Sequence, residues 1–178
     1  IGYHGSEEGL ETLLGYQLFS IGNRADSAAL VYQVDYVLDG YVKKAGTNFV
    51  LSVGRLIGSQ PELKGEQRLR KEDIYWEMPR CYQWDITVNL PEGYRISPEG
   101  LERLNVKVEN DCGAFIVQAT TEDGTLRIKA EKRINHKTEP VANWEKLLEI
   151  TDAANSYEAL SIVFQATINP PTSPTTGY

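Results

Sequence analysis

The sequence predicts an all-β fold: an antiparallel β-sandwich, Ig-like in general architecture, with one packed α-helix near the C-terminus. Apolar and polar residues alternate over several short stretches, most clearly at Trp84–Leu90, and a side-chain period of two is typical of a half-buried β-strand. The dipeptide Asp-Gly at 39–40 and again at 123–124 is typical of tight hairpin turns. Residues 141–151 change to a spacing of three and four, which predicts a helix.

The chain of 178 residues is long enough for one domain with an added arm. Residues 1–27 are interpreted as an N-terminal arm or linker, with a short helix through Leu10–Leu14 that ends at Gly15. The sandwich is expected at 28–168. The segment 169–178 is rich in Pro, Thr and Ser, which predicts a disordered tail.

The remaining elements are predicted from alternation and from turn residues. Up to the clearest strand they are a strand at 30–38 with apolar side chains on both faces, a hairpin turn at 39–40, a return strand at 41–42, a turn at 43–48, a strand at 49–53, a long polar loop at 58–73 and a short strand at 74–78. After it they are a helical turn at 97–100, a three-stranded meander at 104–108, 115–119 and 126–130, and a final strand at 160–168.

The stretch WDITVNLPEGY at 84–94 is expected to be the central strand of the sandwich. Its alternate residues Trp84 and Ile86, followed by Val88 and Leu90, share one apolar face that we assign to the core. Proline at position 91 ends the strand, because it lacks an N–H for the ladder.

The charge and cysteine content exclude some classes of protein. A net charge of -7 argues against a general nucleic-acid binder, and the mixed run at 64–71 is interpreted as a solvated loop. No apolar run approaches the length of a membrane span. Two cysteines, Cys81 and Cys112, are too few for a disulfide framework, and whether they pair stays open. Because the chain begins at Ile1, we expect a processed or excised chain.

Cys112, His136 and Asp152 occur in the chain order of a thiol-nucleophile triad, so a thiol enzyme on Cys112 is one alternative. A catalytic thiol needs a depressed pKa, usually from a helix N-terminus or an imidazolium. Cys112 is instead predicted in a β-turn, and therefore we expect no catalytic residue. No spacing resembles a metal site or a phosphate-binding loop, so neither a metal nor another cofactor is predicted.

Aromatic residues cluster at 75–84. Exposed rings of this kind bind sugars or peptides, which makes Tyr75, Trp76 and Tyr82 candidate binding residues for a glycan or a peptide. The alternative is that these rings fill the core and edges of the sandwich.

Several motifs in order carry a family resemblance. They are YQVDYVLDGYV, FVLSVGRLIGSQ, WDITVNLPEGY, the Asn-x-x-Gly turn at 110–113, and the proline, helix and IVF strand at 140–164. This run, from Tyr32 to Phe164, resembles the C-terminal domain of unknown function that follows a transglutaminase-like core in large Bacteroidetes proteins.

The resemblance implies that the Cys-His-Asp chemistry belongs to the core and that no catalytic residue carries over to this chain. It also implies export to the periplasm or cell surface. We therefore expect a non-catalytic accessory domain that packs on or positions a transglutaminase-like or protease-like core, with the other domains of the parent chain as its partners. A glycan- or peptide-binding module is the alternative.

Overall fold

The computed structural model describes residues 10–23 and 28–167 of the chain. The chain divides into two units, Ile1–Lys43 and Lys44–Tyr178. This boundary differs from the predicted one at 27/28, because the strand predicted at 30–38 pairs within the first unit. The tail predicted at 169–178 lies outside the described residues.

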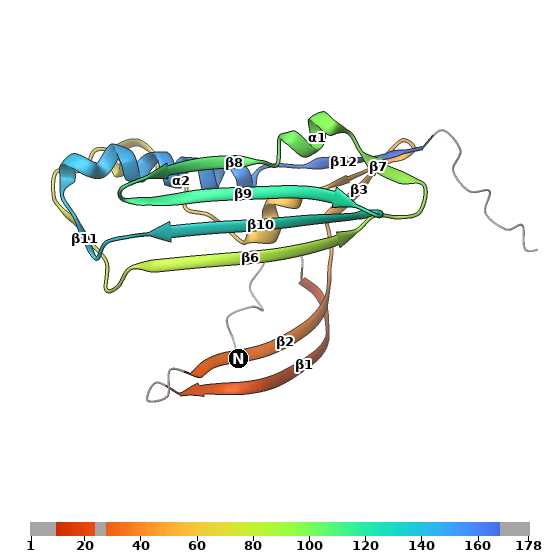
Figure 1. The fold of residues 1–178 in the computed structure, drawn as a ribbon, viewed down its shortest axis with the longest axis horizontal. Helices are drawn as coiled ribbons and strands as arrows, with labels where there is room; N and C mark the ends of the chain where they lie inside the picture. The colour runs from red at the N-terminus through yellow and green to blue at the C-terminus, as the bar shows by residue number, and fades with distance from the viewer. Residues whose placement is uncertain (1–9, 24–27, 168–178) are drawn as a thin grey trace, which may run out of the picture. The chain divides into compact units, whose positions relative to one another are not determined.

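The first unit is a two-stranded antiparallel sheet of β1 (Leu10–Asn23) and β2 (Ala28–Leu38) (Figure 1). The helix predicted through Leu10–Leu14 is wrong, because β2 supplies hydrogen-bond partners to this stretch along its length. The hairpin predicted at 39–40 is also wrong, since β2 pairs with β1 whereas the next strand belongs to another sheet.

The larger sheet of the second unit has the order β6-β10-β9-β8 (Figure 1). Its strands are β6 (Arg80–Asn89), β8 (Val106–Asn110), β9 (Gly113–Glu122) and β10 (Thr125–Ile134). Strands β8, β9 and β10 form the predicted meander. Asp123 and Gly124, between β9 and β10, have φ angles of 47° and 72°, the left-handed values that such a two-residue turn requires.

Strand β6 is an edge strand, so the prediction that WDITVNLPEGY is central is wrong. β10 already pairs with β9 on its other side, and β6 adds outside it. The alternating side chains of β6 on the inner face are only half-buried, which fits an edge position.

The second sheet has the order β3-β4-β12-β7. Its strands are β3 (Val42–Ala45), β4 (Asn48–Leu51), β7 (Tyr94–Ile96) and β12 (Ile162–Ala166). A third, small sheet pairs β5 (Ile74–Tyr75) with β11 (Thr138–Glu139). The turn predicted at 43–48 joins β3 to β4.

Helices complete the second unit. They are the short 3-10 helices η1 (Val53–Ile57), η2 (Gly65–Arg68) and η3 (Val141–Asn143), and the α-helices α1 (Pro98–Glu102) and α2 (Trp144–Glu158). The predicted C-terminal helix is present and extends to Glu158, and α2 contacts β8, β9 and η1. Within the described residues, no helix has the length and apolar character needed to cross a membrane.

The core lies over β9 and β10, on the face that α2 covers. Phe115 of β9 and Tyr157 of α2 are both buried and meet edge-to-face, with ring centroids 5.7 Å apart. Leu126, Ile128 and Ala130 supply the buried face of β10. The predicted fold class, antiparallel β with one helix near the C-terminus, is confirmed.

Candidate functional site

A cavity of about 430 Å³ opens at the β6 side of the larger sheet, within the second unit. This volume lies in the range of small-molecule sites. The sheet supplies aromatic and basic side chains, whereas the loop after η1 and helix α2 supply the opposite wall. The lining residues are Ile57, Ser59, Gln60, Pro61, Trp76, Arg80, Tyr82, Trp84, Lys132, Ile134 and Thr151.

The register of β6 on β10 explains how the sheet builds its side of the cavity. Tyr82 lies opposite Lys132 and Trp84 lies opposite Ala130. Because side chains two residues apart share a face, Lys132 continues the inner face that Ile128 and Ala130 form. The rings of Tyr82 and Trp84 are nearly parallel, with centroids 6.1 Å apart, so they form one aromatic surface along the edge strand.

Lys132 places a charge on an otherwise apolar face. Burial lowers the pKa of Lys132, because a partly desolvated ammonium is less stable in its charged form. Its Nζ donates to Oε1 of Gln60 at 2.9 Å. A neutral amide orients the ammonium without neutralising it, and the described part of the chain shows no ion pair for Lys132.

The loop wall is held by backbone and side-chain contacts. The Gln60 N–H donates to the Glu158 carboxylate at 2.5 Å, and the Gln60 Nε2 donates to the carbonyls of Ile57 and Gly58 at 3.3 and 3.2 Å. The contact with Glu158 ties the loop to the end of α2, and the contacts with Ile57 and Gly58 hold the Gln60 side chain at the end of η1. The Gln60 side chain is thereby held in place to receive Lys132.

Two of the three predicted binding residues line this cavity and one does not. Trp76 and Tyr82 are lining residues, whereas Tyr75 is exposed in β5, outside the lining. The Tyr75 ring instead lies under Lys137, with Nζ 5.2 Å from the ring centroid.

Sequence reasoning missed Arg80, Trp84, Lys132 and Gln60 as lining residues. The sequence does indicate the position of Lys132, because Lys132 belongs to the same strand face as the apolar residues at 126, 128 and 130. The alternation of Trp84 with polar residues predicts a core position, whereas Trp84 is half-buried on an edge strand. Nothing in the local sequence around Gln60 points to this site.

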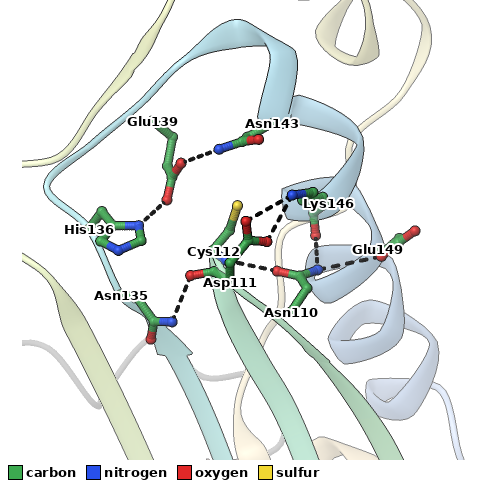
Figure 2. A network of polar contacts seen from close by, with 9 residues as sticks. All are labelled: Asn110, Asp111, Cys112, Asn135, His136, Glu139, Asn143, Lys146 and Glu149. Carbon is green, nitrogen blue, oxygen red and sulfur yellow. Dashed lines mark hydrogen bonds and ion pairs between the residues drawn. The ribbon is translucent and has the colours of Figure 1, made fainter.

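A polar cluster surrounds Cys112, just before the start of β9 and at the same end of the sheet as the cavity (Figure 2). Glu139 is 2% exposed, its Oε1 lies 2.5 Å from Nδ1 of His136, and its Oε2 accepts from Nδ2 of Asn143 at 2.8 Å. Burial by itself raises the pKa of Glu139, but hydrogen bonds with Asn143 and His136 outweigh it and leave the pKa below its usual value.

The pKa of the Cys112 thiol is shifted in the opposite direction to that of a catalytic nucleophile. Burial raises the pKa of Cys112 to about 11, and the negative charges of Glu139 and Asp111 add to the rise. At neutral pH the thiol is therefore protonated. Cys112 packs with Ile74 and Leu147 in a small apolar cluster, and both Cys112 and the exposed Cys81 are free thiols.

The β8–β9 turn is fastened to α2 beside this cluster (Figure 2). Nδ2 of Asn110 donates to the Lys146 carbonyl at 3.0 Å, and its Oδ1 accepts from the N–H of Cys112 at 3.0 Å. Lys146 donates to both carboxylate oxygens of Asp111 at 2.9 Å, and this contact holds the pKa of Asp111 below its usual value. The cluster thus joins the turn to the first turns of the helix.

The third member of the possible triad is engaged elsewhere. Asp152 makes a two-pronged ion pair with Arg68, at 2.8 and 2.7 Å, which holds the pKa of Asp152 below its usual value. Among the described residues, no group of three or more His, Cys, Asp or Glu side chains is arranged to hold a metal ion.

The fold and the cavity describe a β-sandwich domain with an aromatic, basic pocket at the β6 edge of its larger sheet. The family model of DUF3858, a domain of unknown function, matches residues 53–164, which extend from the start of η1 into β12. The match covers more than half of the chain, and the chain therefore belongs to this family. No curated protein and no solved structure matches it.

Proposed function

We propose that this chain is a non-catalytic accessory domain of a larger bacterial protein, in which it packs on or positions a transglutaminase-like or protease-like core. The observation that supports the proposal is the apolar surface of the β1–β2 hairpin. Large apolar side chains are exposed along both strands: Leu13, Leu14, Tyr16, Leu18, Phe19, Ile21, Leu30, Val31, Tyr32, Tyr36 and Val37.

The exposed residues occupy both faces of the hairpin. Leu30 and Val31 are 59% and 46% exposed and, as neighbours in a strand, point to opposite sides. A strand apolar on both faces is typical of a sheet buried on both sides.

A two-stranded hairpin is marginally stable in water, and it needs a further layer or strand to persist. Burial of one Leu, Ile or Phe side chain contributes about 1.5–3 kcal/mol. With eleven large apolar side chains exposed, the hairpin has the composition of an interface rather than of a solvated arm. The neighbouring domain of the parent chain is the partner that we propose.

The geometry around Cys112 supports a non-catalytic role for this chain. The thiol has a pKa raised to about 11, and Asp152 is held by Arg68 rather than by His136. A thiol enzyme needs a thiolate, so the raised pKa of Cys112 supports the non-catalytic proposal.

We further propose that the parent protein is a Bacteroidetes protein with an upstream transglutaminase-like core and that it is exported to the periplasm or cell surface. This part rests on the sequence resemblance. Reading the coding sequence upstream of the codon for Ile1 tests it directly, and an upstream region without such a core would refute it.

Hydrogen exchange of the hairpin amides tests the docking proposal. In the parent protein, the amides of 10–23 and 28–38 should exchange much more slowly than in the isolated chain, because the core covers them. Ile21→Glu should abolish the added protection. Val163→Glu, at an exposed apolar residue of β12, is the matched control and should leave it unchanged. Equal exchange in the two proteins refutes the docking of this hairpin.

A second candidate function is favoured by the cavity at β6: a binding module for a glycan or a peptide. Trp76 and Tyr82 line it as aromatic walls. Titration of the chain with short saccharides and peptides, followed by tryptophan fluorescence, tests this role, and Tyr82→Leu should weaken any binding whereas Tyr75→Leu should not.

A further inference from the structure

The cavity at β6 is lined by basic, aromatic and uncharged polar side chains, which together indicate the class of ligand that fits it. Arg80 and Lys132 are basic, and among the described residues the lining includes no Asp or Glu. The chain as a whole has a net charge of -7, so the positive charge of this lining is opposite in sign to that of the whole chain. A site of this charge favours an anion.

Neither Lys132 nor Arg80 forms an ion pair among the described residues. Lys132 reaches its position from the inner face of β10, where burial works against its charge. Its described polar contact is the neutral Oε1 of Gln60. A carboxylate in the cavity would supply the counter-charge that this contact lacks, and an ion pair to a partly buried ammonium is stronger than one in water.

The other lining groups match the body of a sugar. Trp76, Tyr82 and Trp84 supply flat apolar surfaces, which pack against the C–H faces of pyranose rings. Ser59 supplies a hydroxyl group to the lining. The side-chain donors of Gln60 and Thr151 already bond backbone carbonyls, so these two residues offer their oxygens to ring hydroxyls as acceptors. The volume of about 430 Å³ suits a short saccharide.

We infer that this cavity is a binding site for a short acidic saccharide whose carboxylate is held by Lys132 and Arg80. This inference rests on the second candidate function and deepens it, because it names the class of ligand. It is independent of the docking role of the β1–β2 hairpin, which belongs to the other unit.

The test compares sugars that differ only at the carboxylate. Glucuronate and galacturonate are titrated into the chain beside glucose and galactose, with tryptophan fluorescence and calorimetry as readouts. The uronates should bind about tenfold more tightly than their neutral counterparts, as expected for one charge-assisted contact. Raising the salt concentration should reduce the difference.

Variants identify the groups responsible. Lys132→Gln should remove the preference for the uronates, whereas Lys129→Gln, on the outer face of the same strand, should retain it. Arg80→Gln is a second variant, at an exposed side chain, and it should reduce the preference as well.

Each outcome decides the matter. Uronate preference that is lost in Lys132→Gln and kept in Lys129→Gln supports the inference. Equal binding of acidic and neutral sugars overturns it but leaves the binding module in place. If no sugar binds, the saccharide site is overturned. If a short peptide with a free C-terminal carboxylate binds instead, the binding module remains. If neither sugars nor peptides bind, the binding module fails too.

Discussion

Gly54→Ala provides the sharpest test of how η1 is joined to α2. A Cβ at this position would lie 1.9 Å from the carbonyl oxygen of Tyr157 and 2.5 Å from that of Glu158. Both are backbone atoms at the end of α2, so relief requires η1 and the helix end to separate by roughly 1 Å in a close-packed interior. The separation also strains the hydrogen bond from the Gly54 N–H to the Leu160 carbonyl, 3.0 Å long.

Overpacking costs about 1–3 kcal/mol, and a strained hydrogen bond adds about 1 kcal/mol. We therefore expect Gly54→Ala to lower the free energy of unfolding by about 2–4 kcal/mol, a large part of the 5–15 kcal/mol typical of a domain. Because η1 leads into the loop that carries Gln60, the variant should also weaken any ligand binding at the β6 cavity.

Urea unfolding followed by tryptophan fluorescence measures the change. Gly100→Ala is the control: its Cβ would meet side chains, the nearest being Oγ of Ser97 at 3.2 Å, and alanine favours the helix α1. That variant should stay within about 1 kcal/mol of the original chain. A loss below about 1 kcal/mol for Gly54→Ala would show that η1 and α2 are not packed as closely as described.

A thiol reagent at mildly alkaline pH should modify Cys81 and spare Cys112, because Cys112 is buried and its pKa is raised to about 11. Mass spectrometry measures the labelling, and label on both thiols of the native chain would contradict the prediction. Glu139→Gln should cost roughly 1–3 kcal/mol at neutral pH, since the buried carboxylate loses charged hydrogen bonds. The folded state holds the pKa of Glu139 below its usual value, so this contribution is present above the usual carboxyl pKa and is lost as the pH falls through the folded value; a difference in urea midpoint that stays constant into acid argues against it. Tyr157→Phe should leave stability unchanged or raise it by about 1 kcal/mol, because the buried hydroxyl has no hydrogen-bond partner among the described residues, and a clear loss in thermal unfolding would reveal such a partner.

Elements that depend on neighbours in sequence were predictable. The meander of β8, β9 and β10 follows from alternation and from the Asp123-Gly124 turn, and α2 follows from its spacing after Pro140. The short helix through Leu10–Leu14 was wrong, because two adjacent leucines fit a helix and a strand equally, and the pairing with β2 decides between them.

The candidate site was predictable in part. Trp76 and Tyr82 were found from their type and clustering, and they do line a cavity. Gln60 was not, because its partner Lys132 lies 72 residues further along the chain. The chain order of Cys112, His136 and Asp152 suggested a triad, but Arg68 holds the last of these through a contact that sequence order does not indicate.

By itself the sequence determined the class of fold, the positions of most strands and the long helix, because side-chain period and turn chemistry act over a few residues. Only the tertiary structure decided that β6 is an edge strand, that its inner face is left partly open, and that Lys132 lies in that opening. These features depend on which strand pairs with which and where α2 stops covering the sheet, and packing between distant segments decides both.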